Sequence, residues 1–216
     1  MASGYMTGAY TESKDKKKDA AMLKKAGLDK DERKEFEKKD KAHGKKKKPK
    51  TMAEDKKIDA KIGIEIGVDE GLTSWYFLRE LPELKLYGVD PYAQYIDWNG
   101  NNLDQNGRNN TFEIAVNRLS PYSDRHVLYR TTSDDAVDKF FDDGYDFIFI
   151  DGLHEYDQLK KDCANYYPKI RKGGVFAGHD YKTIAGVTKA VDEFAKSVGA
   201  KPIHLPEKDV WYWIKE

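Results

Sequence analysis

The segment at residues 145–181 constrains the fold of this chain more than any other. It contains two apolar runs, at residues 147–150 and 174–177, and each run is followed at once by polar residues. A segment with helical spacing separates the two runs. This is the pattern of a strand, a crossover helix and a second, parallel strand. The segment therefore predicts an open sheet of parallel strands with helices packed against it.

Four polar side chains follow these two predicted strands. Asp151 and His154 come after the first strand, and His179 and Asp180 come after the second. Open α/β sheets bind ligands in the crevice beyond the carboxyl ends of their strands, and neighbouring parallel strands end at the same edge. Carboxylate and imidazole groups bind metal ions or transfer protons. We therefore expect these four residues to form one functional cluster.

The charge is distributed unevenly along the 216 residues. The formal net charge is zero, but residues 1–57 carry roughly 19 basic and 11 acidic side chains, a net charge of about +8. Because this segment has few apolar residues, it cannot bury enough surface to offset the entropy of ordering. We predict a Lys-rich disordered tail at residues 1–57 and one folded domain at residues 58–216.

Two interpretations of the tail stay open. A run of four lysines, Lys45 to Lys48, would suit a basic arm that binds nucleic acid or another polyanion. Acidic residues between the lysines, and the scarcity of aromatic residues that could stack on bases, favour a solvated tail instead. Nucleic acid is therefore the less favoured partner. A non-catalytic binding module with a polyanion-binding tail is the alternative outside the enzyme class.

Cysteine content and hydropathy indicate the compartment. Cys163 is the single cysteine, which excludes an internal disulfide and fits reducing surroundings. No apolar run approaches the ~18 residues of a membrane span, and the N-terminus has no apolar signal-peptide core. We expect a cytoplasmic protein that does not enter the membrane.

A second group of ligand-binding residues is predicted near the start of the domain. Residues 62–66 form a β-branched run, and Gly67-Val-Asp-Glu-Gly71 and a helical pattern at residues 73–81 follow it. Backbone N–H groups at a glycine turn can approach a ligand closely because glycine lacks a Cβ. A further strand at residues 85–90 ends in Asp90. A carboxylate at this place can accept hydrogen bonds from the hydroxyls of a ribose.

Residues 91–125 are rich in turn-forming residues. Their Asn-Gly and Asn-Asn pairs predict turns, with one short helix at residues 112–119. A long irregular insertion at the ligand edge of a sheet is often a substrate lid, to which Tyr92, Tyr95 and Trp98 would supply aromatic walls. A tolerated surface loop is the alternative interpretation.

The remaining elements continue the alternation of strands and helices. We expect a strand at residues 127–130, a helix at residues 133–141 capped by Ser133 or Asp134, and a helix at residues 184–198. Two apolar runs, at residues 202–205 and 210–214, flank a tight turn. They predict an antiparallel pair of strands at the edge of the sheet.

This order of elements resembles the class I S-adenosylmethionine (SAM)-dependent methyltransferases. Glu65-Ile-Gly67-Val-Asp-Glu70-Gly71 looks like their first motif, an acidic residue followed by glycines around the methionine end of the cofactor. Gly88-Val-Asp90-Pro91 resembles the second motif, whose acid holds the ribose. The glycines do not follow the G-x-G-x-x-G pattern of nicotinamide-binding folds.

The resemblance implies a Rossmann-like methyltransferase sheet that is mostly parallel, with an antiparallel C-terminal hairpin and helices on both faces. It implies that SAM is the cofactor, bound by residues from four segments of the chain. These residues are Glu65, Gly67, Glu70, Gly71, Asp90, Ser133, Asp134 and Asp151, with Ser133 and Asp134 beside the adenine.

A narrower resemblance concerns the methyl acceptor. Residues 149–156 (FIDGLHEY) and 173–181 (GGVFAGHDY) are similar to the small-molecule O-methyltransferases related to macrocin O-methyltransferase and to the catechol type. In those relatives a divalent cation, usually magnesium, binds at this edge of the sheet. By position its ligands would be Asp151, His179 and Asp180. Many relatives have a carboxylate where His179 stands, and imidazole suits Mn, Fe or Zn better than it suits Mg.

The narrower resemblance implies a SAM-dependent O-methyltransferase, assisted by a divalent metal, that methylates a hydroxyl of a small acceptor such as a sugar or a phenol. Asp151 and His154 would be the catalytic residues, with His154 as the base that removes the hydroxyl proton. A metal-independent methyltransferase that uses His154 as its base is the alternative within the enzyme class. Because such relatives often associate, the resemblance is also compatible with a homo-oligomer.

Overall fold

The computed structural model describes residues 60–96 and 101–216. The predicted tail at residues 1–57 and its boundary with the domain lie outside these residues. The division of the chain at residue 58 therefore stays a prediction.

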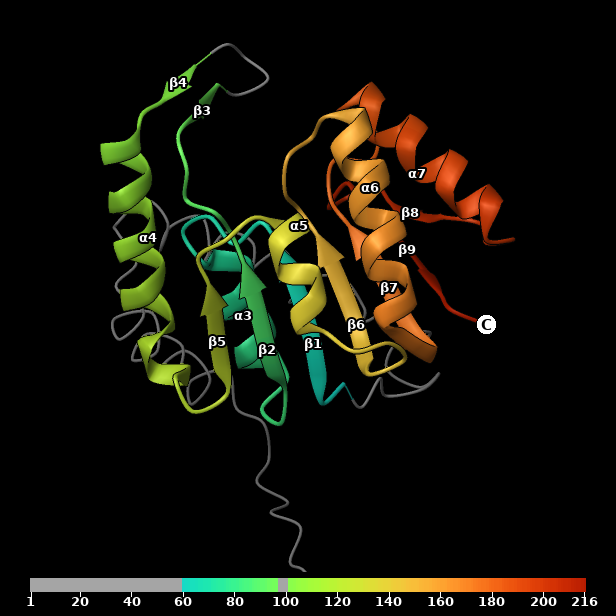
Figure 1. Ribbon diagram of the computed structural model, residues 1–216. Coiled ribbons are helices and arrows are strands. Elements are labelled where there is room, and N and C mark those ends of the chain that lie inside the picture. Colours follow the sequence, from blue (N-terminus) through green and yellow to red (C-terminus); the bar gives the residue numbers. More distant parts are fainter. Residues whose placement is uncertain (1–59, 97–100) are drawn as a thin grey trace, which may run out of the picture. The chain divides into compact units, whose positions relative to one another are not determined.

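A seven-stranded sheet with the strand order β5-β2-β1-β6-β7-β9-β8 forms the centre of the fold (Figure 1). The strands are β1 (Ile62–Ile66), β2 (Lys85–Val89), β5 (His126–Tyr129), β6 (Tyr145–Ile150), β7 (Ile170–Gly178), β8 (Ile203–Leu205) and β9 (Val210–Ile214). The first five strands pair in parallel, and β9 runs antiparallel to both β7 and β8. The predicted Rossmann-like sheet with an antiparallel C-terminal hairpin is confirmed.

Helices cover both faces of the sheet. Figure 1 shows α5 and α6 in front of the sheet and α3 behind it. The α-helices are α3 (Leu72–Glu80), α4 (Gln105–Leu119), α5 (Ser133–Ala136), α6 (Tyr156–Tyr166) and α7 (Ala185–Ser197). Three short 3₁₀ helices are η1 (Ser120–Tyr122), η2 (Val137–Lys139) and η3 (Tyr167–Lys169). A separate two-stranded ribbon, β3 (Tyr95–Ile96) and β4 (Asn102–Leu103), lies between β2 and α4 in the sequence.

The central strand β6 explains where the core lies. All six of its residues are buried, because helices pack against both of its faces. Ile148 and Ile150 belong to the apolar cluster that includes α6 and α7. On the other face, the rings of Phe147 and Phe149 contact Phe77 of α3, with centroid separations of 5.1 and 5.4 Å.

Helix α6 contributes a buried face to this core. Leu159, Cys163 and Tyr166 are spaced three and four residues apart, which places them on one side of the helix. Their side chains are almost entirely inaccessible to solvent, and Cys163 is 0% exposed.

Helix α4 is longer than the sequence pattern predicts. It begins at Gln105 instead of residue 112, so two of the pairs predicted as turns, Asn106-Gly107 and Asn109-Asn110, lie within its first turns. Asp104 caps the helix by accepting a hydrogen bond from the backbone N–H of Gly107 at 2.7 Å. Arg108 and Arg118 are buried and bind groups elsewhere in the domain. These contacts between distant residues outweigh the weak helical propensity of the asparagines.

Helix α5 is shorter than predicted. It ends at Ala136 and continues as the 3₁₀ helix η2 to Lys139. Its N-cap is Thr132, whose hydroxyl oxygen accepts from the N–H of Asp135 at 3.1 Å. The prediction of Ser133 or Asp134 as the cap is therefore wrong, and both side chains are available for other contacts. Within the described ranges, no helix is long and apolar enough to cross a membrane.

Candidate active site

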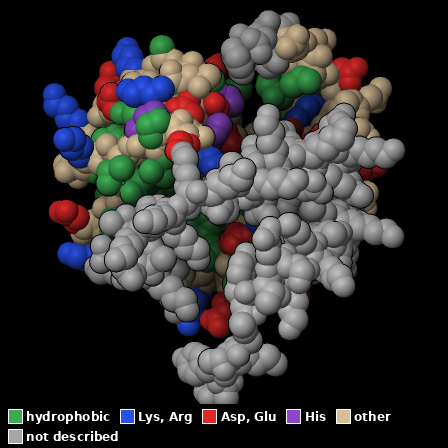
Figure 2. Space-filling model, turned by 180° about the vertical axis from the view of Figure 1, so that it is seen from behind, with side chains coloured by type: hydrophobic (Ala, Val, Ile, Leu, Met, Phe, Trp, Pro, Cys, Tyr) green, Lys and Arg blue, Asp and Glu red, His purple; other side chains and the backbone are tan. Residues whose placement is uncertain are grey.

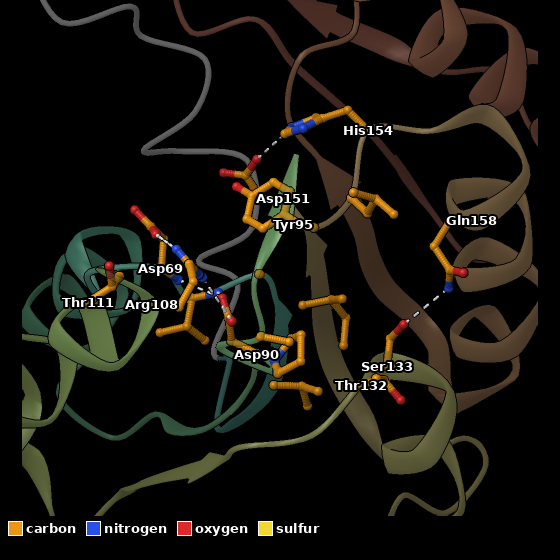
Figure 3. Close-up of a pocket in the computed structure, with 18 of the residues that line it drawn as sticks. Asp69, Asp90, Tyr95, Arg108, Thr111, Thr132, Ser133, Asp151, His154 and Gln158 are labelled. Carbon is orange, nitrogen blue, oxygen red and sulfur yellow. Dashed lines mark hydrogen bonds and ion pairs between the residues drawn. The ribbon is translucent and has the colours of Figure 1, made fainter. Parts of the chain in front are cut away.

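A cleft of about 820 Å³ opens at the carboxyl ends of the parallel strands. Its walls come from the turn after β1, from the residues after β2 and β5, from the segment after β6, and from α4 and α6. Figure 3 shows Arg108 and Asp90 on one side of the cleft, Ser133 and Gln158 on the other, and Asp151 and His154 between them. The predicted ligand edge of the sheet is thus the edge that carries the cleft.

The glycine turn after β1 is pressed against the segment after β6. Gly67 has a φ of 86°, and a Cβ at this position would lie 1.9 Å from the carbonyl oxygen of Asp151. Only glycine fits such a close approach. Gly67 and Glu70 line the cleft, whereas Gly71 lies behind the turn and faces Leu119 of α4; cofactor binding by these residues stays a prediction.

Glu65 lies beneath this turn. Its side chain is 0% exposed and accepts a hydrogen bond from the hydroxyl of Ser74. Burial raises the pKa of Glu65 to about 8. The structure places Glu65 under the cleft floor and not on its surface, so cofactor contact by this side chain stays a prediction.

Asp90 stands where a ribose-binding acid was predicted, but protein groups already occupy its oxygens. Oδ2 accepts from the backbone N–H groups of Val68 and Asp69, at 3.1 and 3.0 Å. Oδ1 accepts from the N–H of Tyr92 at 2.8 Å and from the Arg108 guanidinium at 3.2 Å. A carboxylate offers about four acceptor sites, so Asp90 is held rigidly at the rim of the cleft.

Arg108 is a site residue that the sequence pattern did not indicate. It is 7% exposed, and it also donates to Asp69 at 2.8 Å. Its guanidinium lies over the rings of Tyr92 and Tyr95, 5.4 and 5.5 Å from their centroids. The residue was missed because its partners lie 18 and 39 positions away in the chain.

The predicted aromatic walls are distributed differently from the expectation. Tyr95 lines the cleft, but Tyr92 is fully buried and donates its hydroxyl proton to the carbonyl of Asp69. Trp98 lies outside the described residues.

The four polar residues after β6 and β7 come together as predicted. Nε2 of His154 lies 2.6 Å from Oδ2 of Asp180 and 3.6 Å from Oδ1 of Asp151. Nδ1 of His179 lies 3.1 Å from Oδ1 of Asp180 and 4.0 Å from Oδ1 of Asp151. Figure 2 shows histidine side chains beside acidic ones near the top of the domain, the edge at which the strands end.

The two carboxylates control the protonation of this cluster. Asp151 and Asp180 raise the pKa of His154 to about 9. The same contacts hold the pKa of Asp180 well below its usual range, and Asp180 also raises the pKa of His179.

The donor set fits a divalent cation. Asp151, His154 and Asp180 each offer one ligand atom, and these atoms lie within 4.8 Å of one another. His179, predicted as a ligand from the resemblance, lies outside this group, and His154, predicted as the base, lies inside it. Two carboxylate oxygens with one imidazole nitrogen suit Mn or Fe as well as Mg.

The opposite wall is built around Asp162 of α6. This residue is 1% exposed, and burial raises its pKa to about 6. Ser133 and Gln158 both donate hydrogen bonds to it, at 2.6 and 3.0 Å. Ser133 and Asp134 line the cleft, and their place beside the adenine stays a prediction. Gln158 and Asp162 were missed, although their spacing of four residues places them on one side of a helix.

Comparison with known proteins identifies the family. Residues 64–181 match the family model described as "Methyltransferase domain" (Methyltransf_24). The chain therefore belongs to this family of methyltransferase domains, and the predicted class is confirmed. A relative among curated proteins is "Uncharacterized protein R132" of Acanthamoeba polyphaga mimivirus, with 27% identity over 122 residues. The match covers 55% of this chain and 51% of the relative, so the chain spans about half the length of that protein.

Solved structures share the fold at low sequence identity. The O-methyltransferase NovP is 19% identical with a TM-score of 0.54 and covers 70% of each chain. TomG from Streptomyces achromogenes, in complex with SAM, is 14% identical with a TM-score of 0.52 and covers 74% of this chain and 75% of its own. The Bacillus cereus O-methyltransferase, in complex with SAH, is 15% identical with a TM-score of 0.51 and covers 73% and 76%.

Proposed function

We propose that this protein transfers the methyl group of SAM to a hydroxyl of a small acceptor, assisted by a divalent cation. The observation that carries the proposal is the position of the Asp151, His154 and Asp180 cluster. Asp151 and His154 of this cluster line the same cleft as the glycine turn and Asp90, which are the cofactor motifs of the resemblance. A methyl donor and an acceptor hydroxyl would thus meet at one edge of the sheet.

Different residues of the cleft would contact different parts of SAM. The backbone of the glycine turn would lie against the methionine part of SAM, and Asp90 would lie beside the ribose. Because protein donors fill the acceptor sites of Asp90, ribose hydroxyls would have to share or replace the contact with Arg108. Ser133 and Asp134 would lie beside the adenine.

Methyl transfer forms a bond between the acceptor oxygen and the methyl carbon while the bond from that carbon to sulfur breaks, and SAH leaves. The hydroxyl proton must be removed, and His154 would take it as the imidazole that lines the cleft; it would then serve as the base and not as a ligand of the cation. A divalent cation held by Asp151 and Asp180 would supply Lewis-acid activation of the hydroxyl.

The acceptor is proposed from the cleft and from the relatives. The structures of TomG and of the Bacillus cereus protein are described as O-methyltransferases, which supports a hydroxyl acceptor. Tyr95 and Leu153 add apolar surface to the cleft, which a phenol or the apolar face of a sugar could contact.

Calorimetry with SAH and Mn²⁺ tests the proposal without a known acceptor. We expect SAH to bind the wild-type protein, and Asp151→Asn and Asp180→Asn to weaken Mn²⁺ binding by about tenfold or more, because each removes a charged ligand. Asp138→Asn, on an exposed carboxylate of η2, is the matched control and should bind Mn²⁺ normally.

Failure of SAH to bind would exclude the methyltransferase proposal. If SAH binds but Mn²⁺ does not bind specifically, only the assistance by a divalent cation is excluded. In that case, methyl transfer to a panel of sugars and phenols that survives EDTA but is lost in His154→Ala would establish the metal-independent reaction.

A further inference from the structure

Helix α4 lies directly behind the glycine turn that follows β1. The buried residues of this helix share one of its sides, and they are Arg108, Ala115, Arg118 and Leu119. A Cβ on Gly71 of the turn would lie 2.9 Å from Cδ1 of Leu119 and 3.5 Å from Cα of Ala115. The buried side of the helix and the back of the turn are therefore in direct contact.

Arg118 binds this turn from behind. It is 3% exposed, and its Nη1 donates to the backbone carbonyl of Glu70 at 2.5 Å. The same nitrogen lies 3.5 Å from Oε2 of the Glu70 side chain. Glu70 lines the cleft, whereas Arg118 is not among the residues that form its walls. The guanidinium thus acts on a cleft residue through both its backbone and its side chain, and a charged donor strengthens such contacts.

The peptide group before Glu70 is held as well. The fully buried Tyr92 donates its hydroxyl proton to the carbonyl of Asp69 at 2.8 Å, and Arg108 donates to Oδ1 of Asp69 at 2.8 Å. Figure 3 shows Arg108 beside Asp69. In a trans peptide the C=O and the following N–H point in opposite directions. The contact from Tyr92 therefore directs the N–H of Glu70 away from the Tyr92 ring.

One N–H group of the turn has no protein acceptor. The N–H groups of residues 67–69 and of residue 71 donate to backbone carbonyls or to Asp90. Among the residues that the structure describes, no group accepts from the N–H of Glu70. The peptide groups on both sides of this residue are fixed, one by Tyr92 and one by Arg118. A donor that is already oriented binds a ligand without a further loss of conformational entropy.

We propose that Arg118 is a positioning residue: it fixes the backbone at Glu70 and so keeps the glycine turn in the conformation that receives the amino-acid end of SAM. The inference rests on the proposed function, in which this turn lies against the methionine part of SAM. Without the guanidinium, the peptide after Glu70 would be free to rotate, and ligand binding would have to order it.

A purely structural role for Arg118 would be to attach α4 to the domain. Loss of that role would lower the folded fraction, and the binding of every ligand would decrease in proportion. A positioning role instead predicts weaker binding only for a ligand that reaches the turn. SAH and 5′-methylthioadenosine make this comparison possible, because 5′-methylthioadenosine contains the same nucleoside but lacks the amino-acid end.

The test is calorimetric titration of the full chain with each of these two ligands, at a temperature at which all variants are folded. We expect Arg118→Met to weaken SAH binding about tenfold and 5′-methylthioadenosine binding by less than about twofold, because ordering of one backbone residue becomes part of SAH binding. Arg118→Lys keeps the charge but not the planar group with several donors, so its loss of SAH affinity should be smaller.

Arg125→Met is the matched control. Arg125 is partly buried and donates to three backbone carbonyls at the end of α3 that lies opposite the glycine turn. This variant should lose stability but keep the wild-type ratio of the two affinities. Tyr92→Phe is a second variant, which removes only the hydroxyl donor to Asp69. It should reduce the ratio about threefold, because a neutral hydrogen bond is weaker than one from a guanidinium.

The outcomes separate the inference from the proposed function. If wild-type protein does not bind SAH, the proposed function fails. If it binds SAH no more tightly than 5′-methylthioadenosine, or if Arg118→Met keeps the wild-type ratio, the inference about Arg118 is overturned while the methyltransferase proposal stands. If Arg118→Met does not fold, the ratio measured in Arg118→Lys and in Tyr92→Phe decides in the same way.

Discussion

Gly67 shows how a single residue brings two parts of the cleft together. Its positive φ and the absence of a Cβ let the turn after β1 pass against the carbonyl of Asp151. The glycine turn, which is predicted to bind the cofactor, is therefore in direct backbone contact with the segment that carries Asp151. Gly199, which ends α7, has a similar φ of 71°, but a Cβ at this position would meet nothing within 4 Å beyond its chain neighbours.

These two glycines give a matched pair of substitutions. Gly199→Ala should cost about 1 kcal/mol, because only the left-handed backbone is penalised. Gly67→Ala should cost several times more, about 3 kcal/mol or more, because its Cβ would also overlap the Asp151 carbonyl. Urea unfolding of both variants measures the difference. Equal losses of stability would contradict the described approach of the two backbones.

At the residue scale, the sequence predicts side chains that follow an apolar run. Asp90, Asp151 and Asp180 end strands, so their common edge follows from the topology alone. Arg108 and Gln158 could not be predicted in this way. Their roles come from contacts between elements, and no local pattern specifies which polar residue of a helix will face a cleft.

At the element scale, the hairpin of β8 and β9 supports the loop that carries Asp180. Asp209, in the hairpin turn, accepts from the N–H groups of Lys182 and Thr183, both at 2.8 Å. It also contacts Nε2 of His204 at 2.8 Å. Partial burial alone would raise the pKa of Asp209, but these contacts outweigh it and lower the pKa to about 2. The carboxylate is therefore ionised over the whole physiological range.

Replacing Asp209 by glycine should loosen this loop without straining the turn, because residue 209 has a φ of 47° that glycine adopts readily. We expect Asp209→Gly to speed amide hydrogen exchange at Lys182 and Thr183 by about tenfold, the loss of roughly one hydrogen bond each. Asp209→Asn keeps an acceptor and should have a smaller effect. Unchanged exchange in Asp209→Gly would show that the hairpin does not order the loop.

Elements were predicted best where periodicity is strong. Residues 147–150 and 174–177 lie within β6 and β7, and the hairpin pairs as expected. Helix α4 was predicted too short, because buried arginines and the Asp104 cap stabilise a segment whose composition favours turns. Sequence periodicity does not reveal that contacts with distant residues can stabilise a helix of unfavourable composition.

At the scale of the whole molecule, one partly buried histidine links folding to pH. His126 lies on β5, its Nε2 is buried, and no group of the described residues binds that atom. Burial lowers the pKa of His126 to about 4 from an ordinary value of 6.5. The folded state thus keeps this imidazole neutral at a pH at which the unfolded chain binds a proton.

Above pH 6.5 the imidazole is neutral in both states, and His126 does not reduce the free energy of unfolding. As the pH falls from 6.5 toward 4, only the unfolded chain binds the proton, and the free energy of unfolding decreases. At about 1.4 kcal/mol per pH unit, the loss between these values is about 3 kcal/mol. His126→Leu should remove this dependence. The measurement is the difference in the free energy of unfolding between wild type and variant at about pH 7 and about pH 4.5. A difference that does not change with pH would contradict the neutral, buried imidazole.

The reactivity of Cys163 reports on opening of the fold. It is the single thiol of the chain, it is completely enclosed between α6 and the sheet, and burial raises its pKa. A thiol reagent reaches it only when this layer separates, because a protonated, enclosed sulfur does not react in place. The rate of its alkylation therefore measures how often α6 separates from the sheet. A ligand that binds both α6 and the sheet would reduce this rate.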